Sequence, residues 1–295
     1  MINFQDFGVE DNEKYLSYLK KCPQIPADAS PLNILSLKQK NNVQRGYTEN
    51  LVWHKFNFEG EEFFGTPLGD WDAVDWQKTF AKNVPHETVF QFVPEYLVNI
   101  WKKVFGDSLE IEEDRDYWDY ILDLEKMLKI EGPKFQAFRR LKRYFENNFT
   151  YEVEEITPKI FDELLAFQSY AEKDLQERTG NEYFAENDDL NFKFALKNWE
   201  KFNLFGFVVR VEGKIIAYFL NEKIDEKNII APFAKADYNF KGANQFAYWY
   251  NAKIILERGF LEENFTDDVG EQNLRYFKEH LYPKYMLKKY VVSYN

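Results

Sequence analysis

The chain has 295 residues with a formal net charge of −12 at pH 7, and 45% of its residues are hydrophobic. This length suits one large domain or two of roughly 150 residues, and the hydrophobic content excludes a wholly disordered chain. The negative charge argues against broad, non-specific binding of nucleic acid. A single cysteine, Cys22, excludes an internal disulfide and a multi-thiolate zinc site, and the three dispersed histidines give no reason to expect a metal.

Two further features concern location and core. No apolar run approaches the about 18 residues that a spanning helix needs, and no signal peptide opens the chain, so we expect a cytoplasmic protein. The chain holds 29 phenylalanines, 19 tyrosines and 7 tryptophans, which favours aromatic-rich cores over an aromatic-lined ligand groove.

The first half of the chain predicts a mixed α/β domain. Runs of apolar residues indicate strands, and segments with apolar residues at helical spacing separate them. A Glu59-Gly60 turn joins the first two strands. The predicted elements are strands 51–58 and 61–65, helix 71–83, strand 88–93, helix 95–106 and strand 108–113.

A basic helix follows at about residues 133 to 148. Between Lys126 and Glu146 there are seven cationic residues and only two glutamates. Like charges three or four positions apart repel each other mildly on a helix, so a bound anion would offset the repulsion. A solvated helix face and a localised phosphate site both explain this stripe. The candidate phosphate contacts are Lys134, Arg139, Arg140 and Arg143.

The second half repeats the order of the first. Thr157 and Pro158 begin a helix that Gly180 ends, and a second helix follows Asp188 and Asp189. The later predicted elements are strands 205–211, 214–220 and 228–234, a helix of about residues 240–258, strand 261–265, a helix within 264–285 and strand 285–292.

Each half contains a hairpin that turns at Glu-Gly, at residues 59–60 and 212–213, together with a similar succession of helices and strands. The shared order indicates two mixed α/β domains of one type in tandem. We expect an N-terminal domain of residues 1–132 and a C-terminal domain of residues 133–295, packed tightly because no low-complexity linker separates them.

A family pattern runs through "GPKFQAFRRLKRYFENN" and through "FAKADYNFKGANQFAYWYNA" to "NFTDDVGEQNLRYFKEHLYPKY". The residues that fit it are Gly132, Lys134, Phe135, Arg139, Phe145, Lys235, Ala236, Gly242, Gln245, Asn264, Asp268, Gly270, Leu274, Arg275, Lys278, Tyr282 and Pro283. Those that depart from it are Pro133, Gln136, Ala137 and Phe138, at usually basic or histidine positions, and Ala234, where glutamate is common. Through these residues nearly the whole chain resembles a family of bacterial proteins similar to the C-terminal domain of phosphatidylglycerol lysyltransferase.

The resemblance implies an α/β fold of two tandem GNAT-like acyltransferase domains. It also implies kinship with enzymes that move an aminoacyl group from aminoacyl-tRNA onto an amine or hydroxyl of a lipid, peptide or small molecule, without a cofactor. In a GNAT-like domain the acyl donor enters where the fourth strand meets the next helix, here at "AKADYNFKGANQ". CoA-using members have a glycine-rich phosphate loop there, whereas this stretch offers only Gly242 and Lys241, which disfavours CoA.

Transfer from an aminoacyl ester needs a base, donors for the oxyanion and cations for the tRNA phosphates. The candidate base or acceptor-orienting carboxylate is Asp268, with Arg275 as a partner for an anion and Lys235 as a supplement. Asp268 and Glu271 equally have the spacing of a capping box, and a partly buried Arg275 would equally bind a structural anion. The other candidates for substrate contact are Gly242, Asn264 and Lys278.

The leading hypothesis is therefore a tRNA-dependent aminoacyltransferase that reacts in the second domain, with phosphate contacts from the basic helix. Two alternatives stay open. A CoA-dependent N-acyltransferase would take acetyl-CoA or another acyl-CoA, and a richer phosphate loop would support it. A non-catalytic binding module would have kept the fold alone, which the alanine at position 234 favours.

Overall fold

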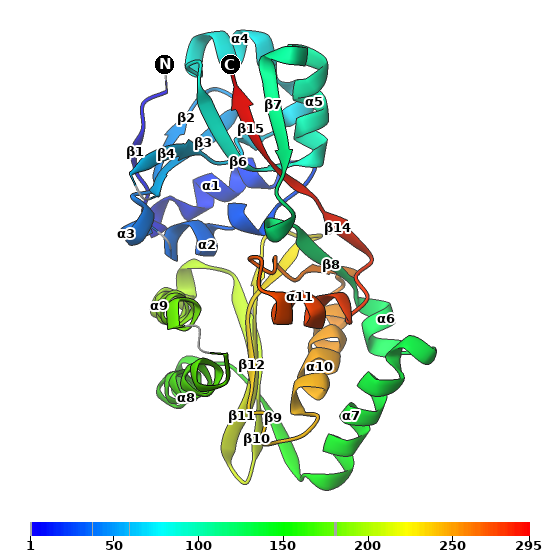
Figure 1. The fold of residues 1–295 in the computed structure, drawn as a ribbon. Helices are drawn as coiled ribbons and strands as arrows, with labels where there is room; N and C mark the ends of the chain where they lie inside the picture. Colours follow the sequence, from blue (N-terminus) through cyan, green and yellow to red (C-terminus); the bar gives the residue numbers. More distant parts are fainter. Residues whose placement is uncertain (1, 37, 59, 180–181) are drawn as a thin grey trace. The chain divides into compact units, whose positions relative to one another are not determined.

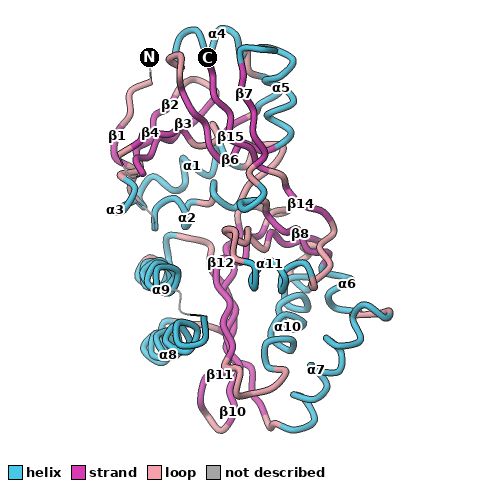
Figure 2. The backbone as a smooth tube through the Cα atoms, in the orientation of Figure 1, coloured by secondary structure: helices cyan, strands magenta, loops and turns pink. Residues whose placement is uncertain are grey.

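The computed structural model describes residues 2–36, 38–58, 60–179 and 182–295. The chain forms two compact units, one of Met1–Ile121 with Asn264–Asn295 and one of Leu122–Glu263, which we call unit 1 and unit 2. Each unit is built from strands flanked by helices, as Figures 1 and 2 show. Among the described residues, no helix has both the length and the apolar character of a membrane span.

Unit 1 contains a mixed sheet in the strand order β1-β2-β3-β4-β6-β15-β7, with β5 paired to β3. The strands β4 and β6 run parallel, and Phe64 and Phe90 form their registered pair. The other registered pairs in this sheet are antiparallel. The strands are β1 (Gln5–Asp6), β2 (Gln44–Tyr47), β3 (Leu51–Phe58), β4 (Glu61–Phe64), β5 (Leu68–Gly69), β6 (Thr88–Pro94), β7 (Leu109–Glu113) and β15 (Lys289–Tyr294).

The last strand determines the extent of unit 1. Strand β15 lies between β6 and β7, and Val292 is in register with Phe90 on one side and Ile111 on the other. Unit 1 therefore takes its C-terminal segment from beyond unit 2. The compact units do not coincide with the predicted domains 1–132 and 133–295, because this strand pairing is not local in the sequence.

The predicted single strand 285–292 is wrong. It divides at Lys288 into β14 (Tyr285–Leu287) and β15, because the two parts pair with different strands. Strand β14 pairs with the start of β8 (Asp119–Asp123), with Met286 opposite Tyr120.

The helices of unit 1 bury an aromatic core against the sheet. Trp101 and Phe80 pack on Phe90, and Trp76 packs on both of them. The prediction of aromatic-rich cores is confirmed, since the largest fully buried side chains are mostly aromatic. The helices are α1 (Asn12–Leu19), α2 (Pro31–Ser36), α3 (Lys38–Asn41), α4 (Trp76–Asn83), α5 (Glu95–Phe105) and α11 (Gln272–Glu279).

Unit 2 contains an antiparallel sheet of β9, β10, β11 and β12, with β13 beside β12. The hairpin of β10 and β11 turns at Glu212 and Gly213, both with positive φ, as the sequence predicts. The matching prediction at Glu59 lies outside the described residues. The elements are α6 (Leu124–Lys129), α7 (Gln136–Asn148), β9 (Tyr151–Glu155), α8 (Phe161–Thr179), α9 (Glu182–Lys197), β10 (Leu204–Val211), β11 (Lys214–Lys223), β12 (Ile229–Ala236), α10 (Ala243–Glu257) and β13 (Glu262–Asn264).

The two faces of the unit 2 sheet are covered by different helices. Figure 1 shows α8 and α9 on one face and α10, α6 and α7 on the other. Successive residues of β11 point to opposite faces. Tyr218 packs against Phe167 of α8 and Phe192 of α9, whereas Phe219 packs against Tyr248 of α10. Each face therefore has its own core.

The predicted helices of unit 2 are present, but α7 begins at Gln136 and α10 at Ala243, each about three residues after its predicted start. Helix α8 is confirmed, although its predicted end at Gly180 lies outside the described residues. Helix α9 begins at Glu182, before the predicted start at Asp188 and Asp189. Both aspartates therefore lie within α9 and not ahead of it.

Candidate functional site

The structure divides the predicted site residues between the two units. Those in unit 1 are Asn264, Asp268, Arg275 and Lys278. Those in unit 2 are Lys134, Arg139, Arg140, Arg143, Lys235 and Gly242. Two polar clusters, each built around a buried carboxyl, hold the predicted catalytic residues. The Asp268 cluster consists of Arg115, Asp116, Tyr120, Asp268 and Arg275, and the Lys235 cluster consists of Gln168, Glu172, Asp188, Tyr218 and Lys235.

In the Asp268 cluster, one carboxylate receives many donors. The side chain of Asp268 is fully buried. Arg275 donates to it from Nε and Nη2, the shorter contact being 2.7 Å, while Arg115 donates at 3.0 Å and Tyr120 at 2.5 Å. The N–H of Gly270 adds a contact of 3.0 Å. Both carboxylate oxygens of Asp268 are therefore occupied by protein donors.

These donors set the charge state of Asp268. Burial alone would raise its pKa, but the hydrogen bonds from Arg275, Tyr120 and Arg115 outweigh burial and hold the pKa below its usual value. A carboxylate with a lowered pKa and occupied oxygens is a weak base. The geometry is that of an ionised anchor for the two arginines, and the role of Asp268 as a base stays a prediction.

The capping hypothesis for Asp268 is wrong. Helix α11 begins at Gln272 with Glu271 as its N-cap, and the Asp268 carboxylate binds the N–H of Gly270 outside the helix. The hypothesis of a structural anion for Arg275 is confirmed, because its guanidinium binds Asp268 at 2.7 Å and Asp116 at 2.6 Å.

The loop before α11 is strained and held by a buried lysine. Thr266 and Val269 have φ of 53° and 45°, a conformation that β-branched residues rarely adopt. The ammonium of Lys278 donates to the carbonyl of Phe265 at 2.7 Å, to Thr266 Oγ1 at 3.0 Å and to the carbonyl of Asp267. Burial is the main reason that the pKa of Lys278 is lowered to about 8. All three of its donors serve the loop, and its predicted contact with substrate stays a prediction.

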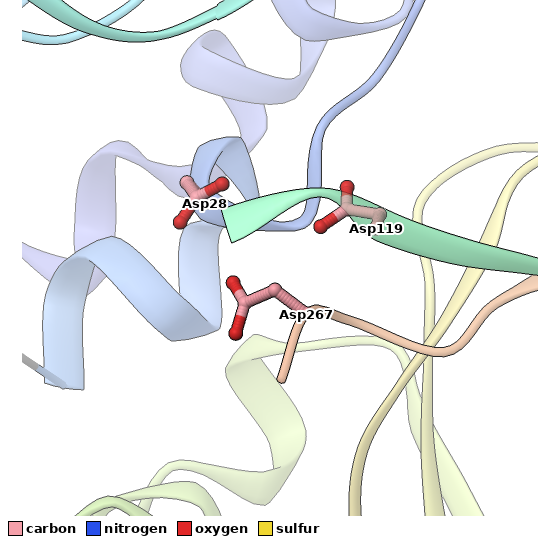
Figure 3. Close-up of side chains that lie close together, drawn as sticks. All are labelled: Asp28, Asp119 and Asp267. Carbon is pink, nitrogen blue, oxygen red and sulfur yellow. The ribbon is translucent and has the colours of Figure 1, made fainter. Parts of the chain in front are cut away.

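Three aspartates lie together beside this loop. Figure 3 shows Asp28, Asp119 and Asp267, whose carboxylates lie within 4.8 Å of one another. The fully buried ammonium of Lys289 binds Asp119 at 2.8 Å, lies 3.6 Å from Asp267 and also binds Asp28. Asn264, a predicted substrate contact, donates to Asp119 at 2.9 Å. A lysine therefore takes the position among the carboxylates that a cation would need.

The Lys235 cluster lies on the α8 and α9 face of the unit 2 sheet. The ammonium of Lys235, on β12, contacts Glu172 of α8 at 2.9 Å and Asp188 of α9 at 2.6 Å. Gln168 donates to Glu172 at 2.9 Å and accepts from the hydroxyl of Tyr218 at 2.5 Å. Four secondary-structure elements therefore converge on one lysine–carboxylate group.

The two carboxyls of this cluster differ in their charge state. Burial raises the pKa of Glu172 to about 7, Lys235 opposes this shift and the neighbouring Asp188 reinforces it. For Asp188 burial also acts upward, but Lys235 and Glu172 outweigh it and lower the pKa. For Lys235 burial acts downward, while Asp188 and Glu172 outweigh it and raise the pKa. Near neutral pH the Glu172 carboxyl is therefore partly protonated, while Asp188 is ionised and Lys235 is charged.

Sequence reasoning missed Glu172 and Gln168, and a signal for them exists. The predicted helix has Leu164 on its apolar face, and Gln168 and Glu172 follow at successive intervals of four residues. Polar residues at those positions point into a core, where each needs a partner. Asp188 and Arg115 carry no comparable local signal, because their partners are distant in the sequence.

The cations of the basic helix fall into two groups. Arg139 donates to the carbonyls of Ile130 and Gly132, the latter at 2.7 Å, and so closes the turn between α6 and α7. Arg140 and Arg143 are exposed, and neither forms an ion pair with any residue that the structure describes. Lys134 is also exposed. Arg140 and Arg143 are available for phosphate contacts, whereas Arg139 is occupied.

A cation and an aromatic ring continue this exposed surface. Lys241, in the loop before α10, lies over the ring of Tyr144 of α7 at 4.9 Å, and Tyr144 is 41% exposed. We call Arg140, Arg143, Tyr144 and Lys241 the α7 patch.

Gly242 has a packing reason to be glycine. Its φ is 91°, and a Cβ there would lie 2.0 Å from the carbonyl oxygen of Leu141. The start of α10 therefore meets α7 without room for a side chain. The predicted contact of Gly242 with phosphate stays a prediction.

The chain was compared with known families and structures. The family model of the C-terminal region of phosphatidylglycerol lysyltransferase matches residues 24–293. No curated protein matches the sequence. A conserved protein of unknown function from Bacteroides thetaiotaomicron is 24% identical, with a TM-score of 0.89 and coverage of 100% of both chains.

Two further structures show the fold at greater distance. The C-terminal domain of a protein named as a lysylphosphatidylglycerol synthetase, from Agrobacterium fabrum, is 17% identical with a TM-score of 0.63, covering 98% of this chain and 93% of that one. A tandem GNAT protein from the clavulanic acid biosynthesis pathway is 9% identical with a TM-score of 0.50, covering 99% and 98%. The predicted class, an α/β fold of tandem GNAT-like acyltransferase type, is confirmed.

Proposed function

Because the chain belongs to the family of phosphatidylglycerol lysyltransferase C-terminal domains, we propose that it is an aminoacyltransferase that takes its acyl group from aminoacyl-tRNA. The acceptor is an amine or hydroxyl of a lipid, peptide or small molecule. The observation that carries this proposal is the fixed position of Lys235, on β12 just before the loop into α10, where two carboxylates hold its ammonium.

The reaction needs a positive charge near the ester carbonyl. When the acceptor attacks that carbon, negative charge develops on the carbonyl oxygen, and a preorganised cation stabilises it. Lys235 supplies that charge in this proposal. Glu172 and Asp188 hold the ammonium of Lys235 in place, so that little reorganisation is needed when the charge develops.

The α7 patch supports the choice of a nucleic-acid donor. Its cations are exposed, and it combines them with an exposed tyrosine ring on which a base can stack. The whole chain is acidic, with a net charge of −12, so binding of tRNA depends on such a local surface.

The test is a comparison of donors. The protein is titrated with acetyl-CoA and, separately, with a charged tRNA pool at two salt concentrations, and transfer of radiolabelled aminoacyl groups to phosphatidylglycerol vesicles or a small amine is measured. We expect tRNA binding that weakens steeply with salt, and transfer. Binding of CoA without tRNA would instead make the chain a CoA-dependent acyltransferase, and binding of neither would leave a non-catalytic module.

A variant locates the reaction. Lys235→Met keeps most of the side-chain volume and removes the charge, so we expect transfer to fall about 100-fold or more while tRNA binding is retained. Lys253→Met is the matched control, because Lys253 is a partly exposed lysine of α10 whose ammonium lies 3.7 Å from Glu257. Full transfer by a folded Lys235→Met protein would contradict the proposed site.

A further inference from the structure

Glu172 has one occupied and one open carboxylate oxygen. Its side chain is 7% exposed. Oε1 accepts from Lys235 at 2.9 Å and from Gln168 at 2.9 Å. Oε2 is buried and receives no hydrogen bond from a donor group that the structure describes, while Glu172 in its protonated form hydrogen-bonds to Asp188. A buried carboxylate oxygen without a donor is costly, and such cost is typical of sites that act on a ligand.

The surroundings fix the orientation of Glu172 and limit access of water. The hydroxyl of Tyr218 holds Gln168, and Gln168 holds Oε1, so the remaining oxygen has a defined direction. Aromatic rings of Phe167 and Phe192 pack around Tyr218. A carboxyl held in this way changes its protonation state without moving.

Asp188 and Glu172 both bind Lys235 but differ in their charge state. Asp188 binds the same ammonium as Glu172, at 2.6 Å, and although burial acts to raise its pKa, Lys235 and the hydrogen bond with Glu172 keep that pKa lowered. Two carboxyls beside one lysine do not ionise equally, and the more buried one keeps the proton longer. Asp188 therefore balances the charge of Lys235, and Glu172 gains and loses its proton beside Asp188.

We propose that Glu172, through Oε2, is the proton acceptor for the nucleophile in the acyl transfer, and that Asp188 keeps Lys235 charged during that step. This proposal rests on the proposed function. It assigns a reacting group that the family pattern in this sequence does not include.

The step balances without another reactant. The acceptor amine attacks the ester carbonyl carbon and forms a C–N bond, and Oε2 of ionised Glu172 takes one N–H proton. The tetrahedral intermediate then collapses with cleavage of the ester C–O bond, and protonated Glu172 returns that proton to the departing ribose oxygen. A hydroxyl acceptor follows the same course with a C–O bond formed.

The pH dependence of transfer follows from the groups around Glu172. Lys235 of β12, Asp188 and Asp189 of α9 and Tyr218 of β11 face this region. Burial, opposed by Lys235 and reinforced by Asp188, places the pKa of Glu172 at about 7. Glu172 must be ionised to accept a proton, so transfer rises with pH between about 6 and 8 and then levels.

The experiment is a pH–rate profile of the full chain, with Glu172→Gln compared with Glu177→Gln. Glu177 lies on the same helix, is exposed and pairs with Lys173. We expect Glu172→Gln to reduce the rate of transfer by about 100-fold or more and to remove the rise near pH 7, with tRNA affinity within about twofold of wild type. Glu177→Gln should behave as wild type, and Glu172→Asp, which keeps a carboxyl, should retain part of the rate and the rise.

The outcomes separate this proposal from the proposed function. Absence of transfer by the wild-type chain would refute the proposed function and the role of Glu172 with it. Transfer by the wild-type chain with an unchanged rate and profile in Glu172→Gln would refute the role of Glu172 alone. A wild-type profile that is flat between pH 6 and 8 would also refute it, whether or not the variants fold.

Discussion

Asp268 in unit 1 and Glu172 in unit 2 are both buried carboxyls beside basic side chains, yet their pKa values move in opposite directions. Asp268 accepts from two arginines, a tyrosine and a backbone N–H, and its pKa is lowered. One carboxylate oxygen of Glu172 accepts hydrogen bonds from Lys235 and Gln168, and the pKa of Glu172 is raised to about 7. The number and placement of donors, more than burial, determines the charge state at neutral pH.

This difference separates two tasks. A carboxylate with both oxygens occupied is suited to holding other groups in place, and the strained loop of Thr266 and Val269 beside Asp268 needs such holding. A carboxyl with an open oxygen and a pKa near neutral is suited to proton transfer. The reacting group is therefore expected in the Lys235 cluster.

The largest expected effect is on stability at Asp268. Asp268→Asn leaves Arg115 and Arg275 without their common counter-charge, and breaking a buried pair of this kind costs about 3–5 kcal/mol. Since the two arginines are partly exposed, we expect about 3 kcal/mol in the free energy of unfolding, measured with urea at pH 7. Asp107→Asn, at an exposed aspartate of the same unit, should change little.

The sign of the pH dependence follows from the lowered pKa of Asp268. Its contribution to stability is present above the ordinary value of 3.8 and is lost as the pH falls through the lower folded value. The gap between wild type and Asp268→Asn should therefore close in acid. A difference in the free energy of unfolding that stayed constant down to the acid transition would contradict the lowered pKa of Asp268. Loss of the rise near pH 7 from the pH–rate profile of Asp268→Asn would contradict the assignment of proton transfer to the Lys235 cluster.

A smaller effect is expected at Glu263, a second buried acid of unit 2. Its partner is the amide of Asn251, at 2.7 Å, and burial raises its pKa to about 8. The folded state keeps a proton that the unfolded state loses, so the free energy of unfolding falls as the pH rises from about 4.5 to about 8. The slope from this group is at most about 1.4 kcal/mol per pH unit.

Glu263→Gln should remove that slope and leave the pH–rate profile unchanged, which distinguishes a raised pKa from a catalytic role. Glu257→Gln, at an exposed glutamate of α10, is the control for stability. If the pH–rate profile shifted in Glu263→Gln and not in Glu172→Gln, the proton transfer would belong to Glu263 and not to Glu172.

The smallest effect is expected in the basic helix. Arg143→Ala should weaken tRNA binding and reduce the salt slope by roughly 1, with stability within about 0.5 kcal/mol of wild type. Arg139→Ala should instead lower the free energy of unfolding by about 1 kcal/mol and leave the salt slope of tRNA binding unchanged. The reason is that Arg139 donates to the carbonyls of Ile130 and Gly132. Equal salt slopes for the two variants would argue against the α7 patch.

Local patterns were sufficient for most of the helices and strands. The Glu212-Gly213 turn, the helix after Thr157 and the aromatic core could be predicted because each depends on neighbouring residues. The strand of residues 289–294 was predicted in place but not in its pairing, since nothing local indicates that it enters the sheet of unit 1. Long-range strand pairing is the part of a fold that sequence periodicity describes least.

Prediction of the candidate sites from the sequence was limited in the same way. Lys235 was found through its family match, but Glu172 and Asp188 become its partners only when three elements meet. Gly242 matched the family as a phosphate contact, and the structure adds that a Cβ would meet the backbone of Leu141. Residue type identified the chemistry, and tertiary contacts decided which atoms are occupied.

The position of β15 has a consequence for synthesis on the ribosome. A nascent chain has every residue of unit 2 once Glu263 is made, whereas unit 1 lacks the strand between β6 and β7 until Tyr294 is made. Until then β6 and β7 present unpaired backbone edges, which are prone to join other chains. The N-terminal part of this protein, although translated first, is therefore the last to be completed, and it is the part that would need protection by a chaperone during translation.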